Sequence, residues 1–378
     1  MRRWNLVLIA IGAAAFASGA ACGSEGGAGT GGDGGTAAQG GPGGDGSAQG
    51  GSSQGGSAQG GSSQGGSPQG GSSHGGAGGD GGDGGAGGEG GAGGGCVDDV
   101  VDALYVESSG DCGGKTPCYT TIQAGADQMG DNTLLVAQGT YVENVSISTA
   151  GLVQGGWTED FCTRSYDASL TVVDGSKAGN TVSGAGSGTL EGMTFENASI
   201  YALSLFSAST MTVNNCIMEN SSRGVGFSGG ANTVQNSIIR GNTGRGFADG
   251  SGDHFVINCT IDGNGTGYGV GNGPFPTLIN NIISNNTVGI EENGSGVSTL
   301  YNNDLWDNGT DYSGIDAGAS DIAVDPQFED AANGDYHLKT GSGCINAGTN
   351  TGAPTTDFDG DERPLDTTTD IGADEYDG

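Results

Sequence analysis

One column of charged and polar side chains could carry acid–base chemistry. Glu219, Arg240 and Asp262 recur at intervals of 21 and 22 residues, and Ser284 and Trp306 continue the spacing. If these side chains share one outer face, Arg240 could act as the base for β-elimination from a uronide, with neighbouring carboxylates holding Ca²⁺. The alternative is an ion-pair ladder of alternating sign, which needs no substrate.

A second group lies on a predicted turn. Asp249, Asp253 and His254 fall within six residues, near Arg245, and an acid beside a histidine can transfer protons. The alternative is a solvated turn without chemistry. Arg223 and Arg245 would lie in adjacent repeats and could bind an anion, unless they are simply exposed loop arginines.

A third group is the acidic run near the C-terminal end of the sequence. Asp357, Asp359 and Asp361 place carboxylates at alternate positions of a tight loop, which suits Ca²⁺. The run is not an EF-hand loop, because its glycine stands elsewhere and the closing glutamate is absent. The alternative is an acidic turn whose carboxylates accept hydrogen bonds from nearby backbone amides. The sequence requires no cofactor, and Ca²⁺ is the one that it suggests.

Repeats of 21 or 22 residues between positions 213 and 308 must position these groups. Asparagine recurs at one place in each repeat, and apolar residues recur at two others. The asparagine column is Asn215, Asn236, Asn258, Asn280 and Asn302. The apolar columns are Val213, Val234, Val256, Leu278 and Leu300, and Met218, Ile239, Ile261, Ile283 and Leu305. A second asparagine column runs from Asn220 through Asn242, Asn264 and Asn286 to Asn308.

This periodicity predicts a solenoid. A coil of about 22 residues is too short for strand, helix and strand, but it fits three short strands joined by three turns. We therefore predict an all-β fold, a single-stranded right-handed parallel β-helix of about eight coils, because parallel crossovers are strongly right-handed. We expect the column from Asn215 to Asn302 to form a structural ladder, with each amide bonded to those above and below.

The region before the repeats predicts a cap. Residues 121–129 fit a short amphipathic helix with Ile122, Ala126 and Met129 on one face, and an open coil end needs such a cover. The next stretch, VAQGTYVEN over residues 136–144, resembles the opening of many bacterial right-handed β-helix proteins of the pectin-lyase-like fold. That resemblance implies a helical plug followed by the coils.

The last part of the sequence carries five short motifs in a characteristic order. Together they resemble the C-terminal region of bacterial surface proteins called choice-of-anchor Q, which follows a β-helix. The resemblance implies a surface protein and no firm biochemical role. The motifs are Asp325–Phe328, Asn333–Leu338, Gly341–Gly348, Asp357–Pro364 and Asp370–Tyr376.

The N-terminal segments predict export and a tether. Residues 1–21 have the charged start, apolar run and small residues of a bacterial signal peptide. Small residues before Cys22 resemble a lipobox, which implies lipidation of Cys22 and localisation at the bacterial outer membrane or cell surface. The alternative is a plain secretory signal. Residues 23–95 hold 38 glycines, which predicts a flexible linker.

The predicted domains follow from these boundaries. Residues 1–21 are the signal peptide, and residues 22–95 provide lipid attachment and the linker. Residues 96–316 form the β-helix with its N-terminal cap, and residues 317–378 form the C-terminal cap.

The charge balance excludes some partners. The chain has 44 acidic and 10 basic residues, a formal net charge of −34. Nucleic acid and anionic membrane surfaces are therefore poor partners, so membrane contact would come through the N-terminal lipid alone. We expect a monomer whose partner is a polysaccharide or another surface ligand.

The cysteine pattern suggests disulfides, as is common in exported proteins. Cys112 and Cys118 lie six residues apart around Gly113, Gly114 and Pro117, and we expect them to pair. Cys216 and Cys259 share a column two coils apart, about 9.6 Å by strand spacing, which is too far for a disulfide. They are predicted to be free and buried.

The loop that carries Cys162 has two predicted neighbours. Cys96 is a candidate disulfide partner, although a weaker one than in the first pair. Trp157 is expected to pack beneath the loop, and its alternative role is an aromatic platform for a sugar ring.

Two functional hypotheses remain. The first is a non-catalytic surface or envelope lipoprotein whose long faces bind glycans or other surface ligands. The second is a polysaccharide lyase or related carbohydrate-active enzyme, with Arg240 and Asp262, or Asp253 and His254, lining a groove. Galacturonase-type hydrolases carry four short motifs along this fold. Only the Asp-Asp pair is present, at Asp98, and it precedes the coils, which argues against that class.

Overall fold

The computed structural model of the protein describes residues 100, 102–207, 209–271, 275–294 and 298–378. The predicted signal peptide, the lipidation site at Cys22, the linker and Cys96 lie outside the described residues. Within the described part of the chain, no helix is both long and apolar enough to cross a membrane.

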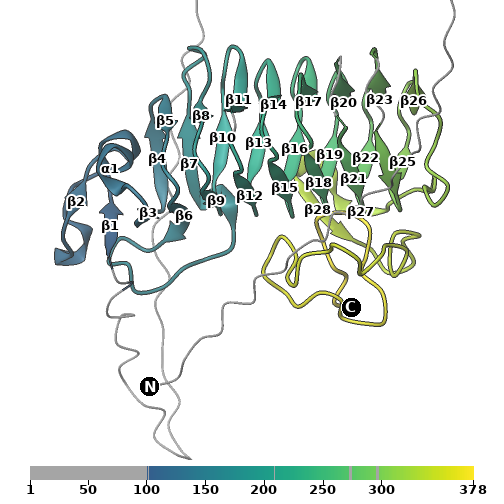
Figure 1. The fold of residues 1–378 in the computed structure, drawn as a ribbon. Coiled ribbons are helices and arrows are strands. Elements are labelled where there is room, and N and C mark those ends of the chain that lie inside the picture. Colours follow the sequence, from purple (N-terminus) through teal and green to yellow (C-terminus); the bar gives the residue numbers. More distant parts are fainter. Residues whose placement is uncertain (1–99, 101, 208, 272–274, 295–297) are drawn as a thin grey trace, which may run out of the picture. The chain divides into compact units, whose positions relative to one another are not determined.

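Successive coils contribute one strand to each of three parallel sheets, and the coils stand side by side along the axis in Figure 1. Sheet A contains, in spatial order, β2 (Cys118–Tyr119), β1 (Ala103–Val106), β3 (Thr133–Ala137), β6 (Leu152–Trp157), β9 (Thr189–Glu191), β12 (Thr212–Asn214), β15 (Thr233–Gln235), β18 (Phe255–Ile257), β21 (Thr277–Ile279) and β24 (Thr299–Tyr301).

Sheets B and C have eight strands each, so the predicted right-handed parallel β-helix of about eight coils is confirmed. Sheet B contains β4 (Gly139–Val142), β7 (Thr171–Asp174), β10 (Thr194–Glu196), β13 (Ile217–Glu219), β16 (Ile238–Arg240), β19 (Thr260–Asp262), β22 (Ile282–Ser284) and β25 (Asp304–Trp306). Sheet C contains β5 (Val145–Ile147), β8 (Val182–Gly184), β11 (Tyr201–Phe206), β14 (Arg223–Ser228), β17 (Arg245–Asp249), β20 (Thr266–Val270), β23 (Val288–Glu292) and β26 (Tyr312–Ser313).

The apolar columns fill the interior in register. Val213 pairs with Leu190 in the preceding coil and with Val234 in the next, and Met218 pairs with Ile239. All five side chains are completely buried. Burial of such a side chain contributes about 1.5–3 kcal/mol. The contribution depends on neighbouring coils, because a single coil leaves both of its edges open.

The column from Asn215 to Asn302 lies at the turn from sheet A to sheet B. All five asparagines have positive φ, between +44° and +57°, a conformation that asparagine tolerates better than most residues. The expected amide stacking is mostly wrong. Among the described residues, only Asn280 donates to its neighbour in the column, Asn258, at 3.2 Å.

The second asparagine column forms the stacked ladder instead. Its side-chain amides bond from coil to coil, from Asn242 to Asn264, Asn286 and Asn308, at 3.0–3.1 Å. Asn220 does not open this column as predicted. Asn220 lies 22 residues before Asn242, but these two coils pair with an offset of 21, as Glu219 with Arg240 shows. Ser221 therefore lies opposite Asn242, and its backbone N–H bonds to Oδ1 of Asn242.

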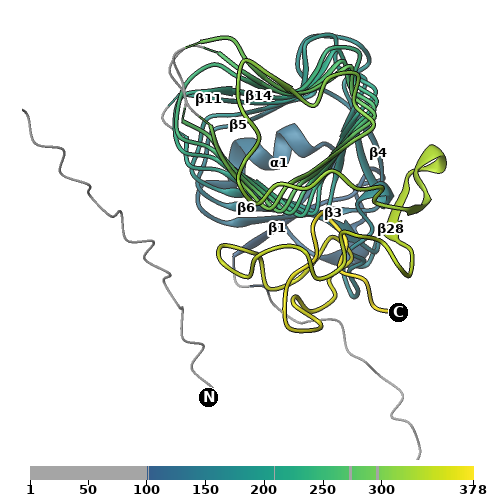
Figure 2. The ribbon, with the colours of Figure 1, turned by 90° about the vertical axis from the view of Figure 1, so that its right-hand side faces the viewer.

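The predicted N-terminal cap is present as α1 (Ile122–Met129), which Figure 2 shows across the end of the coil. Ile122, Ala126 and Met129 are buried. The carboxylate of Glu143 accepts the first N–H groups of the helix, from Ile122 at 2.7 Å and from Gln123 at 3.0 Å. These bonds satisfy donors that a helix N-terminus leaves unpaired.

The cysteines largely follow the prediction. Cys112 and Cys118 form a disulfide beside the 3₁₀ turn η1 (Cys112–Gly114), and Cys216 and Cys259 are free and buried. Cys162 is disulfide-bonded, but the predicted pairing with Cys96 lies outside the described residues. A further 3₁₀ turn, η2 (Ala168–Leu170), precedes β7.

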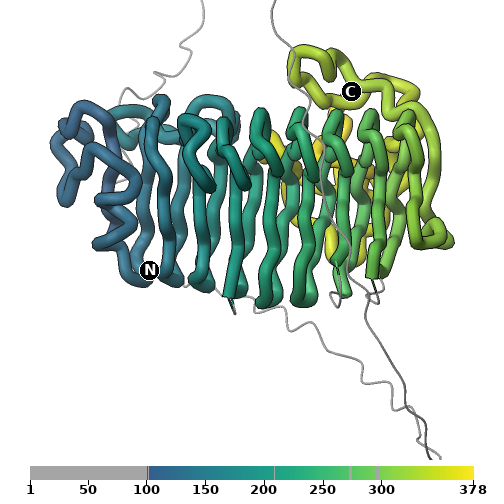
Figure 3. Tube along the Cα trace, turned by 90° about the horizontal axis from the view of Figure 1, so that it is seen from above, coloured from purple at the N-terminus to yellow at the C-terminus, as the bar shows by residue number. Residues whose placement is uncertain are grey.

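The C-terminal region covers the last coil and then returns along the outside of the β-helix. Ile322 bridges to Asp304 at the coil end. An antiparallel hairpin follows, made of β27 (Phe328–Asp330), η3 (Ala331–Asn333) and β28 (Asp335–Leu338). Figure 3 shows the coils in line and the C-terminal region beside them. Its apolar side chains pack on Ile217, Ile238 and Ile282 of sheet B.

Residues 344–376, here called the C-terminal tail, are held by the asparagine column. The side-chain amides donate to backbone carbonyls of the tail at 2.5–3.1 Å, so one segment spans five coils. The bonds join Asn215 to Asp357 and Phe358, Asn236 to Thr356, Asn258 to Asp370 and Gly372, Asn280 to Thr349, and Asn302 to Ala347.

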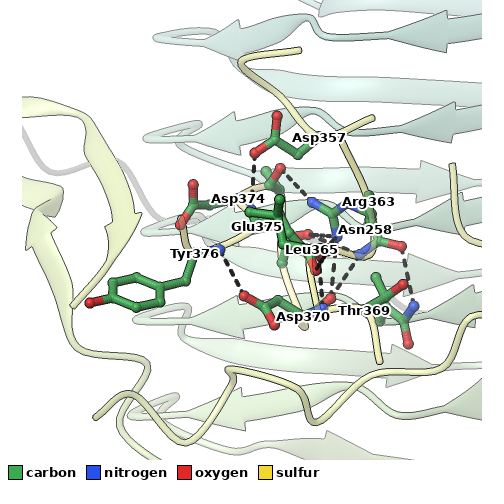
Figure 4. A network of polar contacts seen from close by, with 12 residues as sticks. Asn258, Asp357, Arg363, Leu365, Thr369, Asp370, Asp374, Glu375 and Tyr376 are labelled. Atoms are coloured by element: carbon green, nitrogen blue, oxygen red, sulfur yellow. Dashed lines mark hydrogen bonds and ion pairs between the residues drawn. The ribbon is translucent and has the colours of Figure 1, made fainter. Parts of the chain in front are cut away.

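A buried ion pair closes the tail on itself (Figure 4). Arg363 is 5% exposed and lies 3.5 Å from the carboxylate of Glu375. Its guanidinium also donates to the carbonyls of Asp370, Gly372 and Ala373. Glu375 accepts two backbone N–H groups in return. The motif residues of the C-terminal region are therefore the ones that fix the path of the tail.

Candidate functional site

The hairpin of β27 and β28 borders an open polar hollow on sheet B. The volume of this hairpin hollow is about 480 Å³. Its walls come from the ends of β13, β16 and β19 on one side and from η3 and β28 on the other. The lining residues are Glu219, Asn220, Arg240, Gly241, Asp262, Gly263, Ala331, Ala332, Asn333 and Tyr336.

Arg240 is fixed within the hairpin hollow. Its Nε lies 2.5 Å from the carboxylate of Glu219, and its guanidinium lies 5.9 Å from the ring centre of Tyr336. Gly334 has φ of +90°, and a Cβ there would collide with Arg240, so glycine allows the hairpin to approach. Burial lowers the pKa of Arg240, but the hydrogen bond and charge of Glu219 outweigh it and raise the pKa.

Asp262 is the second fixed charge in the hollow. Its Oδ1 accepts hydrogen bonds from Ser284 and Asn285 at 2.7 Å each, and its Oδ2 accepts from the hydroxyl of Tyr336 at 3.0 Å. Burial raises the pKa of Tyr336, and the charge of Asp262 adds to it. Tyr336 therefore stays protonated, and its hydroxyl donates a hydrogen bond to Asp262.

The predicted charged column thus divides in two. Glu219, Arg240 and Asp262 meet in the hairpin hollow, Ser284 supports Asp262, and Trp306 is 38% exposed outside the lining. The ion-pair reading holds for Glu219 and Arg240. A base for β-elimination must give up its proton at working pH, and the raised pKa of Arg240 opposes that role.

The predicted turn around His254 is not a solvated one. His254 has 0% exposure and stacks on Phe227 with ring centres 4.1 Å apart. Its Nδ1 accepts the N–H of Asn232 at 3.2 Å, and its Nε2 lies 2.8 Å from the carbonyl of Ser251. Because both ring nitrogens are used inside the coil, His254 does not line a groove as the enzyme hypothesis required.

The acids near His254 also differ from the prediction. Asp249 is buried and accepts the hydroxyl of Tyr268 at 2.7 Å, and burial raises its pKa to about 6. Asp253 remains exposed. The sequence could not separate the two, because both stand on one turn and only the inward one is screened from water.

Arg223 and Arg245 lie on strands β14 and β17 and do not form an anion site. Arg245 lies 2.6 Å from the carboxylate of Glu291, two coils away. Arg223 lies over the ring of Tyr201, with its guanidinium carbon 5.4 Å from the ring centre. Trp157 is buried with Phe161 beneath the Cys162 loop, as expected.

The predicted calcium trio does not converge. Both oxygens of Asp357 accept backbone N–H groups, from Asp359 and Asp361 and from Glu375, while Asp361 is exposed. This is the capping alternative for that turn, and Ca²⁺ binding itself stays a prediction.

A different triad gathers instead, formed by His337, Asp359 and Asp374. Their ligand atoms lie within 4.8 Å of one another, and no other group of three is so arranged in the described residues. Sequence reasoning missed His337 and Asp374, because they lie 37 positions apart and outside the repeats. The spacing of Asp335 and His337 on one strand was the available signal.

Comparisons with known proteins agree on the fold. The family described as "Right handed beta helix region" matches residues 178–328, which is less than half of the chain. Among solved structures, the pectate lyase Pel9A aligns with a TM-score of 0.50 at 15% identity and covers 73% of this chain and 96% of its own.

Two pectin methylesterases align more loosely. The enzyme PemA from Erwinia chrysanthemi has a TM-score of 0.32 at 14% identity, covering 55% of this chain and 71% of its own. The Aspergillus niger enzyme has a TM-score of 0.36 at 20% identity, covering 61% and 94%. A comparison with curated protein sequences found no match. The described chain is a right-handed parallel β-helix of the pectin-lyase-like fold.

Proposed function

We propose that the protein is an exported, surface-tethered β-helix that binds neutral glycans in the hairpin hollow without catalysing a reaction. The observation that carries this proposal is the hollow itself, where Arg240 is held by Glu219 and Asp262 is held by Tyr336. Its volume of about 480 Å³ lies in the range of ligand pockets.

The charges of the hollow favour sugars without carboxylates. Two carboxylates face one guanidinium, and the whole chain carries a formal net charge of −34. A polyuronide would meet this field unfavourably. Sugar hydroxyls can donate to Asp262 and Glu219 and accept from Arg240 and Asn333. Because these groups are held in fixed positions, they would orient a bound sugar.

The tether is part of the same proposal. A lipid on Cys22 and a glycine-rich linker over residues 23–95 would hold the β-helix away from the bacterial outer membrane or cell surface. Mass spectrometry of the exported protein tests this step. We expect a lipid-modified N-terminus at Cys22, and an unmodified N-terminus would remove the membrane anchor from the proposal.

Glycan binding can be tested with arrays that carry neutral, uronate-containing and sulfated oligosaccharides. We expect neutral glycans to be retained and Asp262→Asn and Arg240→Met to weaken binding about tenfold or more, the range for hydrogen bonds to charged groups. The matched control is Asp253→Asn, an exposed carboxylate on another turn, which should bind normally. Circular dichroism would confirm folding of all variants. Equal binding by Asp262→Asn and wild type would move the site away from the hollow.

The second candidate is a polysaccharide lyase. It is favoured by the meeting of Arg240, Asp262 and Glu219 in one hollow, as that hypothesis required. The assay is release of unsaturated uronides from polyuronides with Ca²⁺ present over about pH 5–10. Turnover that is lost in Arg240→Met would establish the lyase and overturn the non-catalytic proposal.

A further inference from the structure

The triad of His337, Asp359 and Asp374 joins the hairpin to the C-terminal tail. His337 lies on β28, and both aspartates lie on the tail, 15 positions apart. A small hollow of about 40 Å³ lies beside these three side chains, and its other lining residues are Ile238, Gly334, Tyr336, Phe358 and Ala373. The space suits one ion or one water molecule rather than an organic ligand.

The convergence of the three side chains points to a ligand, and Asp374 is the most buried of them. It is 8% exposed, and its Oδ2 accepts the N–H of Leu338 at 2.8 Å. Its Oδ1 accepts no hydrogen bond from any described residue, although the group faces the cavity that His337 and Asp359 also line. A cation could therefore bind this oxygen without displacing a hydrogen bond between described residues.

His337 is already oriented for such a cation. Its Nδ1 lies 2.6 Å from the carboxylate of Asp335, while its Nε2 faces Asp359 at 3.1 Å. In metal sites a carboxylate commonly accepts the proton of one ring nitrogen and so directs the other nitrogen at the ion. Asp335 has this position on the same strand as His337.

We propose that the triad binds a first-row divalent transition metal, of which Zn²⁺ is the best fit. The ligands would be Nε2 of His337 and one carboxylate oxygen each from Asp359 and Asp374, with water completing the coordination. An imidazole with two carboxylates suits Zn²⁺, whereas Ca²⁺ prefers a set of oxygen ligands only. The bound ion would fasten the hairpin to the tail, and this inference does not depend on glycan binding.

Isothermal titration of the metal-free full-length protein with ZnCl₂ and with CaCl₂ tests the proposal. We expect one equivalent of Zn²⁺ to bind, with Ca²⁺ at least 100-fold weaker. His337→Ala and Asp374→Asn should weaken Zn²⁺ binding by 100-fold or more. Asp335→Asn, which changes a positioning residue, should weaken it about 10- to 100-fold.

The matched control is Asp361→Asn, an exposed carboxylate on the same loop as Asp359 that lies outside the triad. It should bind Zn²⁺ like the wild type. A second readout is the ¹⁵N NMR signal of His337, in which Nε2 should shift on addition of Zn²⁺. Absence of Zn²⁺ binding, equal affinity for Ca²⁺, or unchanged binding in both His337→Ala and Asp374→Asn would each overturn the proposal.

Discussion

Replacement of Arg363 by methionine should release the C-terminal tail and leave the coils folded. Methionine keeps much of the side-chain volume but removes the partner of Glu375 and the donor to three tail carbonyls. The apolar core of the coils is a separate cluster to which the tail contributes no side chain. The damage should therefore be local.

The size of the effect follows from burial. Arg363 and Glu375 are 5% and 3% exposed, and removal of one partner from a buried ion pair costs about 3–5 kcal/mol. If that free energy is lost from the docked state of the tail alone, opening becomes roughly 100- to 4,000-fold more frequent. Glu375→Gln removes the buried charge that Arg363→Met leaves unpaired, although it keeps an acceptor for only one of the two backbone N–H groups. Arg363→Met combined with Glu375→Gln should therefore be less damaging than Arg363→Met alone.

Amide hydrogen exchange followed by mass spectrometry measures this opening directly. Peptides from residues 344–376 should exchange faster in Arg363→Met by the factor above, while peptides from residues 213–308 keep their protection. Unchanged exchange in the tail would show that the asparagine column alone holds it. Equal acceleration in both regions would show that the tail and the coils unfold as one unit, and would refute the local reasoning.

Three further predictions concern the ladder, the corner and pH. Asn264→Ala should lower the free energy of unfolding in urea by about 3 kcal/mol, because its amide serves Ile239, Asp262 and Asn286; the exposed Asn293→Ala should change it by less than about 0.5 kcal/mol. Asn258→Gly should speed hydrogen exchange in the tail, because the bond to Asp370 is lost, but glycine tolerates the left-handed turn. Asn258→Ala should in addition lower the free energy of unfolding in urea by about 1–2 kcal/mol, because alanine is strained at positive φ. Burial raises the pKa of Asp304 to about 6, so the folded state holds this proton more tightly than the unfolded state does. The associated stability is present below about pH 4 and is lost as pH rises through 6, and Asp304→Asn should flatten that part of a thermal-unfolding profile against pH.

The repeats made the coils predictable, because identical columns report identical surroundings. Val213, Val234 and Val256 showed where the core lies, and residues 121–129 showed where it is capped. The role of the asparagine column was misassigned, because recurrence alone does not distinguish stacking from a left-handed turn. Asn215 and Asn242 recur equally well in the sequence, yet only Asn242 bonds along its column.

The candidate site was less predictable for a different reason. Arg240 and Asp262 were identified from their column, but Tyr336 and Asn333 reach them from a hairpin more than 70 positions later. The triad at His337 joins segments without repeats, so no periodicity marks it. Asp249 and His254 are buried, whereas Asp253 is exposed. A short turn motif in the sequence does not indicate which of its residues are buried.

A repeating coil normally shares stability with its nearest neighbours only, so an array of this kind can fray from either end. Here the C-terminal tail bonds to corners of five coils in succession. The ribosome synthesises these coils before the C-terminal tail, so the array must first assemble without the support of the tail. Once the tail has docked, local unfolding of any one of these coils must also break a bond to the tail, which is bonded to the other four coils as well. Unfolding of the mature array should therefore be more cooperative than its repeats suggest.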